Sequence, residues 1–283
     1  MTSTSIWVAM WVLSSLPSSR DGGVAASRPP VPTDAQCQAL GPPMRPLPFG
    51  PGETLEYDID ALGAKAGTMV MRVLPPKPDG RFSIEVAVET NSFFSKVRRV
   101  KGTGTSTVDP RTLQSLHYLE DSVENDVHRV SDVTFLKNRV AKLISTTQAQ
   151  TATSELKWGS DITDVAGAVF VVRSLPLRAG QRLCFDVFAI RRIWRVWGTV
   201  QPREHASLPV GEFEAWHLAG NAARLDLPDF RREVHVWVSD DARRLPLGAL
   251  GSIDLGTVRA TLKAFQRPKE RGSRAESRGT LSW

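Results

Sequence analysis

The sequence predicts a mainly β protein, in which a large curved antiparallel sheet forms a barrel or half-barrel and one apolar helix lies near residues 164–174. The first observation is a period-two alternation of apolar and polar residues, as at Leu55, Tyr57 and Ile59. Such alternation indicates strands with one buried face and one wet face. The second is the number of these segments, about thirteen, which is more than a flat open sheet usually carries. The third is a single apolar stretch that breaks the alternation.

The strand segments follow one another with turn sequences between them. Pro78-Asp79-Gly80 and Asp109-Pro110 are examples of these turns. Short consecutive strands separated by turns predict an antiparallel meander. We expect strands at 54–60, 67–73, 81–89, 96–107, 113–120, 128–135, 139–146, 182–189, 194–200, 213–219, 232–239, 243–250 and 256–265.

The apolar stretch runs from Val165 to Val172 and ends in Arg173. Asp161 or Asp164 could cap the start of a helix there, and Pro176 would stop it. The valines leave a buried strand as the alternative. A helix that is apolar nearly all round has to be covered, so we expect it to plug the concave side of the sheet.

The chain divides into four parts by composition. Residues 1–26 resemble a secretory signal, because an apolar run of eight residues is followed by small residues at Val24-Ala25-Ala26. Residues 27–50 are a proline-rich extended lead-in, whose seven prolines exclude a helix or a central strand. Residues 51–266 form a single β-rich domain, and residues 267–283 form a disordered basic tail.

The predicted compartment is the periplasm or the exterior of the cell. Two features oppose export: no Lys or Arg precedes the apolar run, and Arg20 and Asp21 fall where a signal should be small and neutral. A cytoplasmic protein is therefore the alternative. The two cysteines, Cys37 and Cys184, are too few for a four-ligand zinc site and lack a redox spacing, so we expect one structural disulfide between them.

The net charge of +6 raises the question of a nucleic-acid partner. Half of the excess lies in the tail, where five basic residues face Glu270 and Glu276. Because this charge is not on a folded face, we expect no nucleic-acid binding. The sharper alternative for the tail is peripheral contact with anionic components of the cell envelope.

The templates for catalysis and metal binding have no match. There is no Gly-x-Ser-x-Gly, no His-Glu-x-x-His and no phosphate-binding loop. The five histidines are scattered, and only His217 and His235 could be cross-strand neighbours. We therefore expect no enzyme, no catalytic residue, no metal site and no cofactor.

The tryptophans and one arginine are the candidates for a binding site. Arg173 is the one charge that the apolar helix forces toward the interior, where it would pair with Asp240 or Asp241, or else anchor a ligand. The tryptophans would either fill the core of the barrel or line a cavity for an apolar or glycan-like ligand. They are Trp158, Trp194, Trp197, Trp216 and Trp237.

Four segments resemble a known family when taken in order. They are PGETLEYD at 51–58 with AGT at 66–68, DVAGAVFVVR at 164–173 with LPL at 175–177 and Gly180, VGEFEA at 210–215, and VWVSDDARRLP at 236–246. This order and spacing resembles the DUF3108 proteins, which are bacterial, typically exported and of unknown function. The resemblance covers about residues 50–265. It implies a curved antiparallel sheet and an envelope location, with a fold similar to the unclosed barrels of lipoprotein carriers, and it transfers no catalytic residues.

These observations favour a non-enzymatic periplasmic protein whose curved sheet encloses an apolar cavity for a lipid, a lipoprotein acyl chain or a similar small molecule. The alternative is a structural or protein-interaction module of the cell envelope without a ligand cavity.

Overall fold

One long sheet builds the protein. The structure, a computed structural model, describes residues 30–253 and 256–267. These residues contain sixteen strands, the helix α1 (Val165–Arg173) and two short 3-10 helices, η1 (Asp34–Gln36) and η2 (Phe94–Lys96). The strands are β1 (Thr54–Ala61), β2 (Ala64–Val73), β3 (Phe82–Thr90), β4 (Val100–Val108), β5 (Ser115–Glu124), β6 (Val127–Leu136), β7 (Val140–Thr147), β8 (Gln150–Lys157), β9 (Ile162–Asp164), β10 (Arg182–Ala189), β11 (Arg192–Val200), β12 (Glu204–Leu208), β13 (Gly211–Arg224), β14 (Arg231–Ser239), β15 (Pro246–Ile253) and β16 (Gly256–Gln266).

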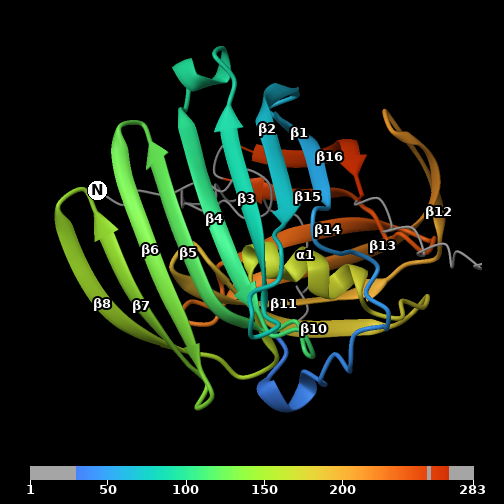
Figure 1. The fold of residues 1–283 in the computed structure, drawn as a ribbon, viewed down its shortest axis with the longest axis horizontal. Helices are drawn as coiled ribbons and strands as arrows, with labels where there is room; N and C mark the ends of the chain where they lie inside the picture. Colours follow the sequence, from blue (N-terminus) through green and yellow to red (C-terminus); the bar gives the residue numbers. More distant parts are fainter. Residues whose placement is uncertain (1–29, 254–255, 268–283) are drawn as a thin grey trace, which may run out of the picture.

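The strand order is β8-β7-β6-β5-β4-β3-β2-β1-β16-β15-β14-β13-β11-β10-β9, with β12 paired to β13. Every pairing is antiparallel except that of β9 with β10. The chain therefore makes one meander through β8 and a second one that returns to pair β16 with β1. Figure 1 shows the first meander running across the second, so that the sheet folds over itself with α1 between its two halves. The predicted curved antiparallel sheet with one helix is confirmed.

The thirteen expected strands are all present, and three more were missed. β8 is exposed on both faces, so it shows no apolar alternation. β9 has only three residues, and β12 pairs with β13 alone. The expected strand at 96–107 begins later, at Val100, because η2 and the loop after it occupy residues 94–99.

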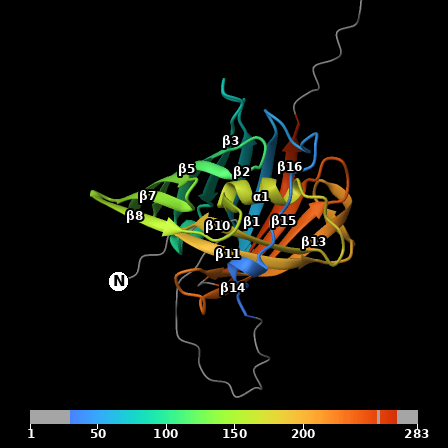
Figure 2. The ribbon, with the colours of Figure 1, turned by 90° about the horizontal axis from the view of Figure 1, so that it is seen from below.

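The concave face of the sheet carries the core. In β1, Leu55, Tyr57 and Ile59 are buried, as the alternation predicts. Register extends this face across the strands, because Tyr57 lies opposite Met69 in β2 and opposite Leu262 in β16. Buried side chains of both meanders thus meet around α1, which Figure 2 shows from below.

The helix begins and ends as the sequence predicts. Asp164 is the N-cap, and its side chain accepts hydrogen bonds from the backbone N–H groups of Ala166 and Gly167. Every residue of α1 except Val169 is buried. The helix contacts β3, β4, β9 and β10, so it lies on the concave face of the sheet.

The lead-in is fastened along β10 and β11. Cys37 and Cys184 form the predicted disulfide, with 5.1 Å between their Cα atoms. Arg195 in β11 binds Asp34 at 2.7 Å, which holds η1 in place. The described part of the lead-in, residues 30–50, contains no strand, and η1 is its single helical turn. The signal-like segment 1–26 and residues 268–283 of the basic tail lie outside the described residues. Arg267, which we expected in the tail, contacts the core through the Pro48 carbonyl.

Candidate functional site

A cavity of about 90 Å³ lies between α1 and the curved sheet. Among the residues that line it in the described part of the chain, none is charged. Met69 and Met71 of β2 close one side, and small residues of β11, β13, β15 and β16 form the floor. The wall that faces these strands is made by Ala168, Val169 and Val172 of α1 with Leu183, Phe185 and Val187 of β10.

The hollow exists because side chains are missing from one row of the concave face. Gly198 in β11 lies directly opposite Gly220 in β13. A Cβ atom on Gly198 would lie 2.5 Å from the carbonyl oxygen of Ala219. A Cβ atom on Gly220 would overlap the carbonyl oxygen of Trp197. These two strands therefore need glycine at this point, and the missing side chains leave space beneath the helix.

The first end of α1 is held by a buried carboxylate. Asp164 is fully buried, and its Oδ2 accepts hydrogen bonds from Ser106 of β4 at 2.5 Å and Ser115 of β5 at 2.7 Å. Its Oδ1 accepts from the first turn of the helix. Burial raises the pKa of Asp164, and these hydrogen bonds oppose the rise. The start of α1 is thereby tied to the first meander.

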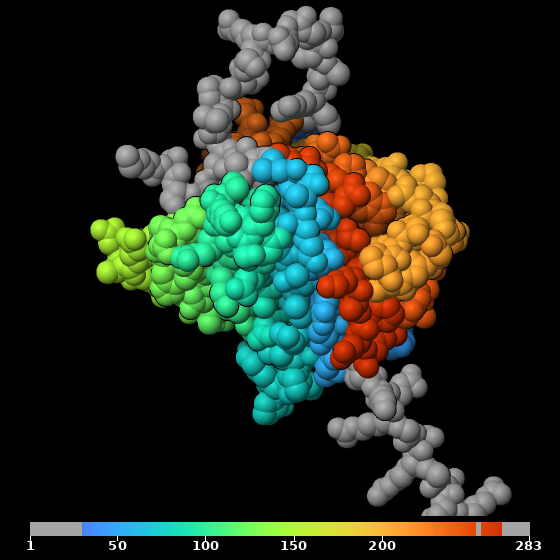
Figure 3. All heavy atoms as spheres, turned by 90° about the horizontal axis from the view of Figure 1, so that it is seen from above, coloured from blue at the N-terminus to red at the C-terminus, as the bar shows by residue number. Residues whose placement is uncertain are grey.

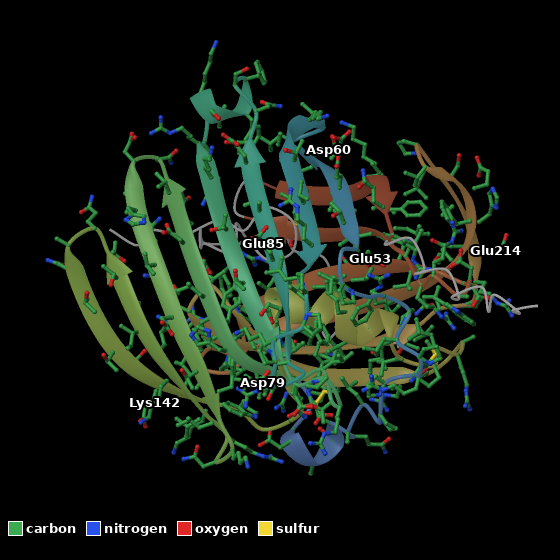
Figure 4. The ribbon with its side chains drawn as sticks, viewed as in Figure 1. Glu53, Asp60, Asp79, Glu85, Lys142 and Glu214 are labelled. Carbon is green, nitrogen blue, oxygen red and sulfur yellow. A yellow bond between two sulfur atoms is a disulfide. The ribbon has the colours of Figure 1, made fainter. Side chains whose placement is uncertain are left out.

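The other end of α1 is held by Arg173, which is fully buried. Its guanidinium pairs with Glu53, at 2.5 Å between Nη1 and Oε1. It also donates to the backbone carbonyls of Arg244 at 2.9 Å and Arg243 at 3.1 Å. Figure 4 places Glu53 at the beginning of β1, close to the end of α1. The rings of Phe49 and Phe170 each lie 5.2 Å from the guanidinium carbon.

The predicted acidic partner of Arg173 is therefore wrong, although the predicted burial and pairing are correct. Asp240 binds Arg203 and Arg244, while Asp241 binds Arg243. The β14–β15 turn does reach Arg173, but it offers backbone carbonyls, because its own arginines take up both carboxylates. The Arg173 side chain does not line the cavity.

Tyr57 is a polar group at the cavity wall. Its hydroxyl donates a hydrogen bond to the carbonyl of Pro246 at 2.8 Å. Burial raises the pKa of Tyr57, so the phenol is neutral at physiological pH. The hydroxyl is thus used inside the protein, which leaves the cavity apolar in character.

The tryptophans do not gather around this cavity. Trp194 is buried, donates to the carbonyl of Ala189 at 3.1 Å and packs on Phe230. Trp216 is buried and donates to Asp240 at 2.7 Å. Trp158 packs edge-on against Phe135, in the other half of the sheet.

Trp197 and Trp237 lie apart from those three. Trp197 is opposite Cys184, so its side chain is on the convex face. It lines the cavity through its backbone, next to Gly198, where no side chain covers the strand. Trp237 is also on the convex face, where it stacks on His217 with 4.6 Å between the ring centroids. The five tryptophans therefore do not form an aromatic-lined cavity. Most of them fill separate parts of the structure.

The two histidines are cross-strand neighbours, as the sequence suggested. Nε2 of His217 lies 2.8 Å from Nδ1 of His235, and the ring centroids are 5.1 Å apart. These two distances place both nitrogens close to the line between the ring centroids, which is the geometry of an N–H···N hydrogen bond. Burial lowers the pKa of His217, Glu204 raises it, and His235 lowers it further. Within residues 30–253 and 256–267, no group of three His, Cys, Asp or Glu residues is placed to hold a metal ion.

A group of buried charges on the concave face was not predicted from the sequence. Glu124 of β5 pairs with Arg98 at 2.6 Å and with Arg129 of β6 at 3.1 Å. The period-two spacing of Glu120, Ser122 and Glu124 is the signal that could have placed them on the buried side.

A second hollow, of about 300 Å³, lies between residues 39–43 of the lead-in, the β4–β5 loop and β9. Its polar groups bind one another: Asp161 accepts from Gln114 at 3.0 Å and from the backbone N–H of Leu40 at 2.9 Å. The smaller cavity under α1 is the better candidate because its lining carries no charge.

Comparison with known proteins places the chain in a family. The family described as "Protein of unknown function (DUF3108)" matches residues 56–263, so the chain belongs to the DUF3108 family. No curated protein matches the chain.

A solved structure shows a similar fold at low sequence identity. A β-barrel-like protein of the DUF1849 family from Brucella abortus superimposes with a TM-score of 0.56 at 9% identity, over 78% of this chain and 99% of that one. A Bacteroides fragilis protein with a YmcC-like fold, described as exported, gives 0.32 at 10% identity, over 78% and 98%. The first likeness supports the β-barrel-like fold. None of the helices within the described residues has the length and apolar character needed to cross a membrane.

Proposed function

We propose that this protein is a non-enzymatic protein of the cell envelope that binds the end of an apolar chain, such as an acyl chain of a lipid or lipoprotein, beneath α1. The observation that carries the proposal is an uncharged, apolar cavity inside the hydrophobic core, since protein interiors generally leave few voids of this size. Ligand sites are concave and mainly apolar, and this cavity has both properties. The charged groups at the ends of α1 are engaged in fixed contacts, so the proposal assigns them no catalytic role.

The size of the cavity narrows the ligand class. An engineered apolar cavity of about 150 Å³ accepts benzene, whereas this cavity measures about 90 Å³. It is therefore smaller than a cavity that is known to hold one aromatic ring. Asp164 and Arg173 hold α1 at both ends, and these contacts would have to break before the helix could move away and enlarge the space. We infer that the ligand inserts the end of one alkyl chain and keeps its remaining part outside.

The envelope location in this proposal is supported by the disulfide between Cys37 and Cys184. Disulfides persist in oxidising compartments and are rare in the cytosol. The bond also ties the lead-in to β10, beside the cavity wall, so the oxidised form is the one in which to look for a ligand.

The test is native mass spectrometry of protein expressed in the periplasm, followed by solvent extraction and lipid analysis. We expect a co-purifying molecule with an alkyl chain. Ala249→Leu places a larger side chain in the cavity from β15 and should abolish this retention. Ala264→Leu makes the same change in β16 on the convex face and is the matched control.

Wild-type protein that carries no ligand after gentle purification would overturn the proposal, as would equal ligand retention by the two variants. The second candidate function is an interaction module without a ligand. The exposed strand β8, at the end of the sheet, favours it. Cross-linking in the envelope to a single stable protein partner, with no bound lipid, would support that candidate instead.

A further inference from the structure

β8 ends the first meander as an open edge. It stands last in the strand order and pairs only with β7 among the described residues. Seven of its eight residues are exposed, and its register with β7 is regular over the whole length. Figure 3 shows this end of the sheet projecting from the rest of the molecule.

The register shows which backbone groups of β8 are free. Just beyond the strand, the N–H of Trp158 donates to the carbonyl of Arg139 at 3.3 Å, which makes this facing pair a hydrogen-bonded one. In an antiparallel ladder such pairs alternate with non-hydrogen-bonded pairs. Following the register back along β8, the residues with even numbers bond to β7. Thr151, Thr153 and Glu155 therefore direct their N–H and C=O groups away from the sheet.

Residues 150–154 of this edge lack the usual protection against pairing, and the charged residues of β8, Glu155 and Lys157, stand at its C-terminal end. Natural sheets shield their edges with charged residues, prolines, bulges or very short strands. Residues 151–154 read Thr-Ala-Thr-Ser and contain no charge or proline. At the opposite end of the sheet, β9 is only three residues long and leads directly into α1. β8 is thus a complete strand that is ready to accept a neighbour.

We propose that β8 pairs with β8 of a second copy of this chain, antiparallel about a two-fold axis, with Thr153 opposite the partner's Thr153. Only odd-numbered residues have free backbone groups, so the axis passes through a residue rather than between two. The two strands overlap most when that residue is in the middle of β8, which is Thr153 or Ser154. With Ser154 on the axis, the two Glu155 side chains become diagonal neighbours, and like charges so placed repel. With Thr153 on the axis, Glu155 faces the partner's Thr151 and the two Thr153 side chains form a favourable cross-strand pair.

The geometry also sets the size and limit of the assembly. Three facing pairs, each exchanging two hydrogen bonds, give about six backbone hydrogen bonds between the copies. The pairing uses the same edge of both copies, so it closes at a dimer. The interface consists of one strand per copy and falls in the small, transient class. We expect a dimer that dissociates on dilution between about 1 mM and 10 µM.

Sedimentation velocity across this concentration range tests the proposal on the full-length secreted protein. Thr153→Pro removes a backbone N–H that points away from the sheet. Because this N–H makes no bond to β7, proline on this free edge leaves the β7–β8 ladder intact. We expect this variant to keep the wild-type melting temperature and to stay monomeric. Thr153→Val keeps the N–H and should dimerise like the wild type.

A second measurement does not depend on how the proline variant folds. The Cα atoms of a hydrogen-bonded antiparallel pair lie about 5.5 Å apart, which suits a disulfide. Thr153→Cys should therefore give a covalent dimer with oxidised glutathione. Lys142→Cys, exposed on β7 as Figure 4 shows, is the control and should not. A wild-type protein that is monomeric up to about 1 mM, or equal cross-linking of the two cysteine variants, would overturn the proposal.

Discussion

Replacing Arg173 with methionine removes the group that ties the end of α1 to β1 and to the β14–β15 turn. The change leaves Glu53, which is 1% exposed, without its main partner. It also leaves the carbonyls of Arg243 and Arg244 without the donor that now binds them. Breaking a buried ion pair by removing one partner costs about 3–5 kcal/mol.

The lower part of this range is the expected result. Arg267 lies 3.6 Å from the second oxygen of Glu53 and retains part of the compensation. Methionine also keeps some of the packing against Phe49 and Phe170. For a domain of this size, each kcal/mol lowers the melting temperature by about 2–4 °C, so we expect a loss of roughly 6–12 °C, measured by calorimetry or circular dichroism.

The double variant Arg173→Met with Glu53→Gln isolates the cause. If the stranded carboxylate is the main penalty, removing its charge should restore at least about 1 kcal/mol, because the two sites are directly coupled. A melting curve of Arg173→Met that overlays the wild type within about 0.5 kcal/mol would refute this reasoning. That outcome would make Arg173 a candidate for ligand binding after all.

Three further perturbations have definite expected outcomes. Reducing the Cys37–Cys184 disulfide, whose cysteines are separated by 147 residues, should lower the unfolding free energy by up to about 5 kcal/mol in denaturant titrations; unchanged stability would mean that the lead-in contributes nothing to the fold. Asp164→Ala should cost about 2–4 kcal/mol, because it removes the helix cap and leaves two buried serine hydroxyls without their acceptor; a loss below 1 kcal/mol would contradict the role of this side chain as a clamp. Because the pKa of His217 is lowered in the fold, the unfolded chain takes up a proton first as pH falls, so unfolding free energy should decrease below about pH 6.5. His217→Gln should make the unfolding free energy less dependent on pH in this range. A pH profile equal to that of the wild type would contradict the assignment of this effect to His217.

The sequence alone was enough for the features that depend on near neighbours. Alternation over eight residues places Leu55, Tyr57 and Ile59 on one face, and the structure buries all three. Asp164 before the apolar run and Pro176 after it mark the limits of the helix that the structure shows. β8 was missed for the same physical reason, since a strand that is wet on both faces has no alternation to detect.

The sequence also determined that Arg173 would be buried and paired, and that Cys37 would meet Cys184, because few alternatives existed for either. Only the tertiary structure decided that the partner of Arg173 is Glu53, 120 residues away, and that the nearby aspartates bind other arginines. The same holds for the cavity, which arises where Gly198 and Gly220 face each other across two strands. Such features depend on register and on the path of the sheet through space, and a pattern within one strand carries information only about which face is buried.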